Sequence, residues 1–319
     1  RFLIPFSVER PGLGIGSPIL RVWANNFAPL GTPLIDAEGA AESIDNVLEA
    51  MANPAAGLPP VLVIPDMKLN RPAAQLIRAI AMSRNLPLTT VDERERPMLE
   101  SLLDGEAYLA ETVSSKHNHE MRRQWRKLSE KGEVAYSVAR QPRDVLRRME
   151  EYLLLESTGW KGKEKTALTI DRLRSAFARE AVYNLAAADK VRIHTIDLDG
   201  RAIASLIVFI ASGEAYTWKT AYDEAHAECS PGKILMSKVT EWHLDDANIV
   251  RTDSLAVPDH PVMSRFWKER DAMATLIIGL QPNRDRDVRQ IATQLHLYQN
   301  TRNVARKLRD RILSLRGRS

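Results

Sequence analysis

The sequence has a single cysteine, Cys229, among its 319 residues. One cysteine excludes an intrachain disulfide and gives no metal-ligand spacing, which favours a reducing compartment. Long apolar runs are also missing: the longest, such as residues 202–211, fall short of the roughly 18 residues that a transmembrane helix needs. The seven histidines are scattered along the chain, so we expect no metal site.

The composition is otherwise ordinary. Charged residues make up 27% and hydrophobic residues 44% of the chain, which excludes collagen-like, low-complexity and disordered classes. A single hydrophobic core usually stops growing before a chain reaches this length. We therefore expect a folded protein of two domains.

The positive charge is concentrated in two segments. The chain carries 45 Lys and Arg against 41 Asp and Glu, a net charge of +4. Residues 116–131 carry +4 and residues 283–319 carry +7, so the remainder carries −7. These segments hold only Trp125 and Tyr298 as aromatics and no nucleic-acid motif. We expect no specific nucleic acid as a partner, but two basic surfaces of which at least one faces phosphates.

Hydrophobic periodicity predicts alternating strands and helices in the first half of the chain. This order is typical of an α/β fold. The predicted helices cover residues 43–52, 71–85, 105–132, 142–155 and 171–188, the predicted strands cover 61–64 and 133–139, and a loop covers 159–163.

A different pattern begins at residue 191. Strands over 191–198, 202–211 and 214–221 follow one another through Asp199-Gly200 and Ser212-Gly213, which are strong hairpin signals. We predict an antiparallel meander here. After the turn Ser230-Pro231-Gly232, the pattern predicts a helix to residue 246, a strand at 249–257, a helix at 262–271, a strand at 274–280 and an amphipathic helix at 283–319.

This order of elements resembles the acyl-CoA-dependent N-acyltransferase (GNAT) fold, and several motifs resemble its BioF2-like/CelD-type branch. Motifs in the second half are Leu155-Glu156-Ser157-Thr158-Gly159-Trp160-Lys161-Gly162, Trp218-Lys219-Thr220-Ala221-Tyr222-Asp223-Glu224, Ser230-Pro231-Gly232-Lys233-Ile234-Leu235 and Asp253-Ser254-Leu255-Ala256. Motifs in the first half are Gly31-Thr32-Pro33-Leu34-Ile35-Asp36, Arg96-Pro97 and Arg122-Arg123-Gln124.

The resemblance implies tandem GNAT-like halves related to Fem-type transferases. The expected fold class is α/β (α+β), with mixed sheets flanked by helices and a C-terminal amphipathic helix. The expected division is an N-terminal half at 1–115, a basic connecting helix and strand at 116–140, a catalytic GNAT domain at 141–283 and a basic helical tail at 284–319.

The activity that the resemblance implies is acyl transfer, of acetyl or another acyl group, from acyl-CoA to an amine. The acceptor would belong to the cell envelope or to an exopolysaccharide, as an amine-bearing sugar or lipid. Three alternatives stay open: a long-chain acyl donor with a lipid amine, a Fem-type aminoacyl transferase, and a non-catalytic scaffold at the membrane. We expect a cytoplasmic protein, and leave open a homodimer and contact of the basic tail with the inner membrane.

Ser230, Gly232 and Lys233 are the expected phosphate-binding residues. Free N–H groups at a helix N-terminus attract phosphates, and glycine lets the backbone approach them. The usual GNAT turn, Q/R-x-x-G-x-G/A, is absent, so Ser-Pro-Gly can instead simply cap the helix. The resemblance also places Trp218 and Lys219 of the third meander strand beside the pantetheine of CoA.

Three residues are candidates for the chemistry. Asp253 and His260 are candidate bases for the attacking amine, since a histidine has a suitable pKa. Tyr222 is a candidate donor to the departing thiolate. The alternatives are a structural hydrogen-bond role for Asp253 and a helix cap or solvated loop for His260.

The expected acceptor-binding residues are Trp160, Lys161 and Asp223. Trp160 and Lys161 combine an aromatic platform with a charge, which suits a sugar or another polar acceptor. The alternative for Trp160 is a role in packing. Cys229 lies beside the glycine turn, but without a visible base we do not expect a catalytic role for it.

Overall fold

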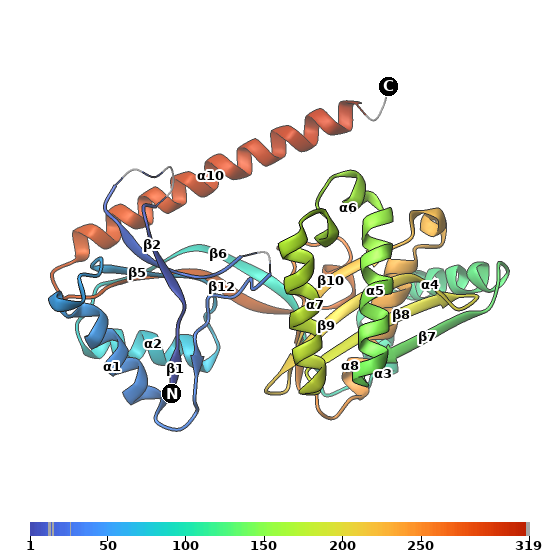
Figure 1. Ribbon diagram of the computed structural model, residues 1–319, viewed down its shortest axis with the longest axis horizontal. Coiled ribbons are helices and arrows are strands. Elements are labelled where there is room, and N and C mark those ends of the chain that lie inside the picture. Colours follow the sequence, from blue (N-terminus) through green and yellow to red (C-terminus); the bar gives the residue numbers. More distant parts are fainter. Residues whose placement is uncertain (12–13, 15, 26, 317–319) are drawn as a thin grey trace. The chain divides into compact units, whose positions relative to one another are not determined.

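The computed structural model describes residues 1–11, 14, 16–25 and 27–316, with side chains up to residue 301. The chain forms two compact units (Figure 1). The first combines Arg1–Glu95 with Asp271–Ser319, and the second is Arg96–Arg270. Strands β6 (Leu88–Leu99) and β12 (Glu269–Gly279) contribute residues to both units.

The first unit is built on a mixed sheet. β12 pairs antiparallel with β5 (Val61–Lys68), and β5 pairs parallel with β3 (Ile19–Val22). β2 (Phe6–Glu9) extends this sheet beyond β3, and β6 neighbours β12 on the other side. β1 (Phe2–Leu3) and β4 (Leu34–Ile35) form a separate antiparallel pair.

Helices cover both faces of this sheet, and alternate residues of β5 pack against the helices on opposite faces. Leu62 and Ile64 pack with α1 (Ala40–Ala52) and α2 (Pro72–Ser83). Val61 and Val63 pack instead with the start of α10 (Asp285–Arg316). Because successive side chains of a strand point to opposite faces, a continuous apolar run suits a strand covered on both sides.

The second unit contains the predicted meander of β8 (Val191–Leu198), β9 (Arg201–Ala211) and β10 (Glu214–Tyr222). β7 (Val134–Ala139) pairs antiparallel with β8, and β11 (Arg251–Asp253) joins β10 to β6. Asp199-Gly200 and Ser212-Gly213 have φ angles of 50°, 76°, 51° and 77°. Such positive φ values are those of two-residue hairpin turns, so both predicted hairpins are confirmed.

Five longer helices flank this sheet (Figure 1). They are α3 (Gly105–Thr112), α4 (Ser115–Ser129), α5 (Pro142–Thr158), α7 (Arg172–Ala187) and α8 (Pro231–Asp245). The shorter helical turns of the chain are η1 (Pro54–Ala56), α6 (Trp160–Lys163), η2 (Leu168–Ile170), η3 (Glu224–Cys229) and α9 (Met263–Phe266). The predicted fold class, α/β with mixed sheets flanked by helices, is confirmed.

Several predicted elements have other bounds. The helix expected over 105–132 is two helices, because Val113 is extended and the Ser114 hydroxyl caps α4 by accepting the His117 N–H at 3.3 Å. The loop expected at 159–163 contains α6. The strand expected over 249–257 is only β11. The helix expected over 262–271 ends at Phe266, where the fully buried Trp267 anchors the chain by donating to Thr240 at 2.9 Å.

The C-terminal helix begins as predicted, and its residues Val288, Ile291 and Leu295 are buried. The later apolar positions of its predicted stripe, from Ala305 to Leu315, lie outside the described side chains. Within the described part of the chain, each helix is too short or too polar to span a bilayer.

Candidate active site

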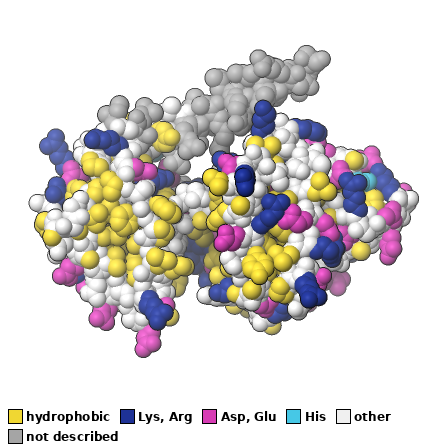
Figure 2. Space-filling model, in the orientation of Figure 1, with side chains coloured by type: hydrophobic (Ala, Val, Ile, Leu, Met, Phe, Trp, Pro, Cys, Tyr) yellow, Lys and Arg dark blue, Asp and Glu magenta, His cyan; other side chains and the backbone are white. Residues whose placement is uncertain are grey.

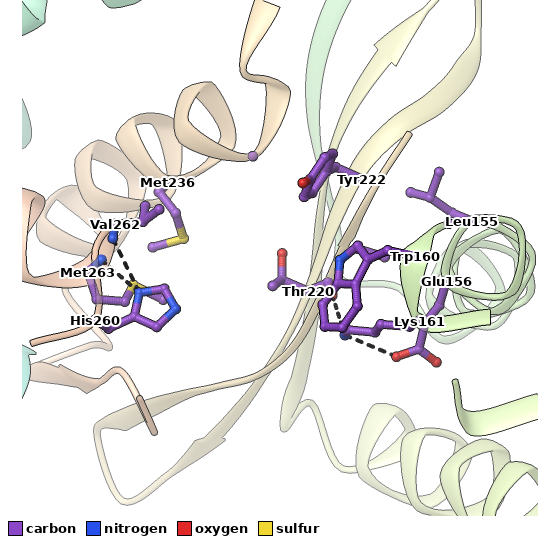
Figure 3. A pocket seen from close by; sticks show the side chains of 13 residues that line it. Leu155, Glu156, Trp160, Lys161, Thr220, Tyr222, Met236, His260, Val262 and Met263 are labelled. Carbon is purple, nitrogen blue, oxygen red and sulfur yellow. Dashed lines mark hydrogen bonds and ion pairs between the residues drawn. The ribbon is translucent and has the colours of Figure 1, made fainter. Parts of the chain in front are cut away.

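A pocket of about 380 Å³ lies in the second unit (Figure 3). Three parts of this unit form it: the end of α5 with α6, the end of β10, and the first turns of α8 together with the segment around α9. The lining residues are Leu155, Glu156, Gly159, Trp160, Lys161, Thr220, Ala221, Tyr222, Gly232, Met236, His260, Val262 and Met263.

The pocket begins where two parallel strands separate. β10 pairs with β11 only from Glu214 to Tyr216, although β10 continues to Tyr222. The Thr217 hydroxyl donates to the Ser254 carbonyl at 2.6 Å and so fixes the point of separation. Beyond it, one edge of β10 has no strand partner within the described chain, and Thr220, Ala221 and Tyr222 border the pocket there.

The free edge of β10 directs backbone groups away from β9. The Asp223 N–H donates to the Ile203 carbonyl at the end of β9 at 2.8 Å. Because backbone groups alternate between the two edges of a strand, those of Tyr222 and Thr220 face the other edge. The Thr220 carbonyl, which accepts from the Lys161 ammonium at 2.7 Å, agrees with this direction. The N–H groups of Thr220 and Tyr222 are therefore available to a ligand in the pocket.

Lys161 and Glu156 form a fixed wall of the pocket. The Lys161 ammonium donates to Glu156 Oε1 at 3.1 Å in addition to the Thr220 carbonyl. Glu156 is only 3% exposed, and it also accepts from the Tyr152 hydroxyl at 3.0 Å and the Leu168 N–H at 2.8 Å. Lys161 keeps one of its three N–H groups for a ligand, whereas Glu156 is occupied by internal partners.

The Gly-Trp-Lys-Gly motif has a steric reason. A Cβ at Gly162 would lie 1.7 Å from the Ser157 carbonyl oxygen, so only glycine fits where α6 turns back against α5. This turn brings Trp160, which is 41% exposed, to the pocket beside Lys161. The predicted acceptor-binding pair therefore lies in the pocket (Figure 3).

The first turn of α8 offers fewer donors than the glycine turn suggested. Pro231 has no N–H, and the N–H groups of Lys233 and Ile234 donate to the Ser230 carbonyl at 2.9 and 3.2 Å. This leaves the Gly232 N–H as the open donor among the described residues of this turn. A Cβ at Gly232 would touch the Tyr222 ring at an ordinary 3.6 Å, so the position tolerates a small side chain but borders the pocket.

His260 acts as a helix cap. Its Nδ1 accepts the N–H groups of Val262 at 3.3 Å and Met263 at 3.2 Å, which begin α9. Burial lowers the pKa of His260 below its ordinary value, so the ring is neutral near pH 7. With Nδ1 accepting, the ring hydrogen is on Nε2, which faces across the pocket toward Thr220 and Trp160 (Figure 3). These contacts agree with the capping alternative, and this tautomer leaves Nε2–H as a donor to the pocket. A role for His260 as the base stays a prediction.

Asp253 lies outside the residues that line the pocket. Its side chain is fully buried; Oδ1 accepts the Leu255 N–H at 2.7 Å, and Oδ2 lies 3.5 Å from an Arg96 guanidinium nitrogen. These contacts agree with the alternative from the sequence, in which Asp253 has a structural hydrogen-bond role. A role for Asp253 as the base stays a prediction.

The other candidate residues are divided between the pocket and its surroundings. Tyr222 lines the pocket, and its hydroxyl points toward the side that Met236 forms (Figure 3). The remaining predicted binding residues, which do not line it, are Trp218, Lys219, Asp223, Ser230 and Lys233.

Local contacts explain three of these positions. Trp218 is buried and packs on Phe209, with ring centroids 4.9 Å apart. The Lys219 ammonium lies 5.7 Å from the Trp218 ring, and burial, assisted by the nearby positive charge of Lys161, lowers the pKa of Lys219. The Asp223 carboxylate caps η3 by accepting the Ala225 N–H at 2.9 Å.

Sequence reasoning missed Glu156, Thr220, Met236 and Met263 as pocket residues. Glu156 and Thr220 belong to the two motifs at 155–162 and 218–224, in which other residues were the expected site residues. The signal for Glu156 was a carboxylate at the end of a predicted helix, next to Gly-Trp-Lys-Gly. Met236 carried a helical-spacing signal, one turn after Gly232.

The sequence of this unit matches one family model. Residues 115–255 match the model described as acetyltransferase (GNAT) domain. No curated protein matches the chain.

Three solved structures are similar in fold. The C-terminal domain of a proposed lysylphosphatidylglycerol synthetase from Agrobacterium fabrum is 13% identical with a TM-score of 0.55, over 91% of this chain and 83% of that one. A conserved protein of unknown function from Bacteroides thetaiotaomicron is 7% identical with a TM-score of 0.53, over 83% and 80%. FemX is 9% identical with a TM-score of 0.52, over 88% and 84%. Residues 115–255 are therefore similar to the acetyltransferase (GNAT) domain family, in a chain whose fold resembles that of FemX.

Proposed function

We propose that this protein is an acyl-CoA-dependent N-acyltransferase, with acetyl as the transferred group, and that the pocket beside β10 is its active site. The observation that supports this most is the free edge of β10, where the N–H groups of Thr220 and Tyr222 face a pocket that also contains the Nε2–H of His260. Several hydrogen-bond donors directed at one small space suit a carbonyl oxygen that becomes negative during acyl transfer.

The pocket fits the thioester end of acyl-CoA. Ala221, Met236, Val262 and Met263 supply apolar surface for an acyl group, and the Gly232 N–H begins a helix whose dipole favours negative charge. An acyl-CoA would supply the acyl group as an activated thioester. Gly232 would hold it at the helix N-terminus, with the Lys233 side chain as an added positive charge.

The donors of the pocket have separate tasks in this proposal. His260 and the edge of β10 donate to the carbonyl oxygen of a substrate. An amine that arrives as an ammonium loses one proton before it attacks and a second from the tetrahedral adduct. The departing thiolate takes one of these protons, so the other must pass to a base or to water. The Tyr222 hydroxyl is the pocket group suited to donate to the departing sulfur. Asp253 remains a proposed base, although its side chain does not line the pocket.

The acceptor is proposed to be an amine of a sugar or lipid related to the cell envelope or an exopolysaccharide, as in the BioF2-like/CelD-type branch. The remaining N–H of Lys161 and the exposed ring of Trp160 give the pocket a polar contact and a flat apolar contact for such a molecule. A cytoplasmic location, a homodimer and contact of the basic tail with a membrane also remain proposals.

A second candidate is aminoacyl transfer. The first turn of α8 leaves one open N–H, which is a weak grip for the pyrophosphate of CoA. FemX and the lysylphosphatidylglycerol synthetase domain share the fold, and α4 carries a row of exposed cations that suits a phosphate-rich donor. The two candidates differ in donor and share the pocket.

Turnover with both donor classes separates these candidates. The purified chain would be incubated with a small amine and either acyl-CoA thioesters or aminoacyl-tRNA, and thiol release or aminoacyl loss would be measured. Release of CoA thiol that depends on the amine supports the proposal. Turnover of aminoacyl-tRNA alone would assign the second function, and turnover of neither donor would contradict both.

A further inference from the structure

The chain makes a left-handed turn soon after β11. Leu255 has a φ angle of 47°, in the region of backbone conformation that favours glycine. A residue with a Cβ adopts this conformation at a cost, and leucine is less suited to it than asparagine or aspartate. Residues held in such a conformation are concentrated at functional sites, where the surrounding structure keeps them in place. The contacts that hold Leu255 therefore deserve a functional explanation.

Side chains from three strands hold this turn. Asp253 Oδ1 accepts the Leu255 N–H at 2.7 Å, and Oδ2 lies 3.5 Å from the Arg96 guanidinium. The Thr217 hydroxyl of β10 donates to the Ser254 carbonyl at 2.6 Å. Charged side chains generally lie at the surface, as they do on the face in Figure 2, but Asp253 is fully buried and Arg96 is 5% exposed. A buried carboxylate is costly unless it is paired, so the turn is built around a specific and demanding contact.

The turn determines where the edge of β10 becomes free. β11 pairs in parallel with β10 only as far as Asp253, which lies opposite Tyr216. The sequence pattern predicts a strand that continues to residue 257. Such a strand would lie along β10 toward Tyr222, and its backbone would occupy the N–H groups that now face the pocket. The left-handed residue prevents this, because its backbone angles are incompatible with an extended strand.

We propose that Asp253 is a positioning residue, whose carboxylate holds Leu255 in the left-handed conformation and so keeps the edge of β10 open to a ligand. The same turn begins the segment that carries His260 to the opposite side of the pocket. The donors on both sides of the pocket thus depend on one buried carboxylate. This role acts through the backbone and is separate from proton transfer by Asp253. Its effect on a substrate rests on the proposed function, whereas the turn itself does not.

Two substitutions at Leu255 test the turn without changing a charge. Leu255→Val keeps an apolar side chain, but a β-branched residue is poorly suited to a positive φ, whereas Leu255→Gly adopts it without strain. Amide hydrogen exchange of the full chain without ligand would be measured over residues 254–263, four of whose N–H groups donate to side chains. We expect exchange about tenfold faster in Leu255→Val than in the wild type, and a rate close to that of the wild type in Leu255→Gly.

Variants of Asp253 test the carboxylate in the same exchange measurement. Asp253→Ala removes the acceptor and should speed exchange over residues 254–263, while Asp253→Asn keeps an oxygen for the Leu255 N–H and should exchange more slowly than Asp253→Ala. Leu255→Gly combined with Asp253→Ala should recover part of the protection, because glycine needs less support at this angle. Asp246→Ala is the matched control, because Asp246 Oδ1 accepts the Asn248 N–H at 2.9 Å in a turn that does not line the pocket. Its exchange over residues 254–263 should equal that of the wild type.

Calorimetric titration of acetyl-CoA into the Leu255 variants connects the turn to the pocket. If the β10 edge is open in one tenth of the molecules, affinity falls about tenfold, as we expect for Leu255→Val but not for Leu255→Gly. Equal exchange in the wild type, Leu255→Val and Asp253→Ala would overturn the proposal, as would unchanged affinity in a Leu255→Val protein that exchanges faster. If Asp253→Ala does not fold, the two Leu255 variants decide alone. The expected exchange in a wild type that binds no acetyl-CoA would support the turn and contradict the proposed function instead.

Discussion

The Nδ1 atom of His260 accepts the backbone N–H of Met263 at 3.2 Å, and this bond decides what the ring can do in the pocket. A neutral histidine has one acceptor and one donor nitrogen, so the acceptor used at α9 leaves a donor on the pocket side. Protonation of Nδ1 would break the cap. The ring is therefore suited to donate to a substrate oxygen and poorly suited to remove a proton from an amine.

His260→Asn should separate capping from donation. Asparagine is a good helix cap and its oxygen can replace Nδ1, but it has no group at the position of Nε2. We expect near-normal stability and a loss of about 100-fold in turnover, the size typical of removing one such donor. Thermal unfolding and steady-state rates check this.

His260→Ala is the comparison, because it removes both the cap and the donor and should lose stability as well. Unchanged turnover in His260→Asn would show that Nε2–H does not touch the reacting atoms.

The protein should lose stability in acid because of two buried histidines. Burial lowers the pKa of His243 to about 3, and burial with the neighbouring His243 lowers the pKa of His194 well below its ordinary value. The unfolded chain binds protons at these residues near pH 6.5, while the folded chain does not. The free energy of unfolding should therefore fall as pH decreases from about 6.5 toward 3.

Denaturant unfolding between pH 8 and pH 4 measures this slope. His243→Gln should flatten the slope, since glutamine does not titrate. An identical slope in wild type and variant would remove His243 as a cause.

The contributions of Glu156 and Lys161 to the free energy of unfolding should be coupled. Lys161→Met leaves a buried carboxylate without its cation and should destabilise the protein by about 3 kcal/mol. Glu156→Gln combined with Lys161→Met removes both charges and should recover part of that loss. A double-mutant cycle by denaturant unfolding checks this, and additive effects would contradict the coupling.

The start of α10 should be part of the core of the first unit. Ile291 is 2% exposed and packs with Val63 and Ile277, so Ile291→Ala should cost about 2–5 kcal/mol. Leu297→Ala on the same helix is the control, because Leu297 is 59% exposed. Equal stabilities would show that the helix is not required by the core.

The strongest local signals in the sequence predicted the fold best. Val191–Leu198 and the Asp199-Gly200 turn combine a buried apolar run with left-handed turn residues, and they form β8 and its hairpin as expected. β6 was missed because Asp92-Glu93-Arg94-Glu95 reads as a polar segment, whereas strand pairing with distant residues holds it extended. Periodicity does not report pairings of that kind.

The sequence predicted some residues of the pocket, but it did not predict the backbone hydrogen bonds that determine what those residues can do. Trp160, Lys161, Tyr222, Gly232 and His260 come from separate motifs that the pocket brings together. The sequence could not show that the Ser230 carbonyl occupies the next two N–H groups of α8, or that the helix cap occupies His260 Nδ1. Both depend on local backbone geometry that residue types alone do not determine.

Calorimetric titration of acetyl-CoA into the full chain tests the central claim most directly. We predict binding by the wild type, nearly equal binding by Gly232→Ala, and affinity at least about tenfold weaker for Gly232→Glu, because a carboxylate at the start of α8 repels phosphate and fills the pocket border. No binding by the wild type, or equal affinities for all three proteins, would contradict the assignment of this pocket to an acyl-CoA.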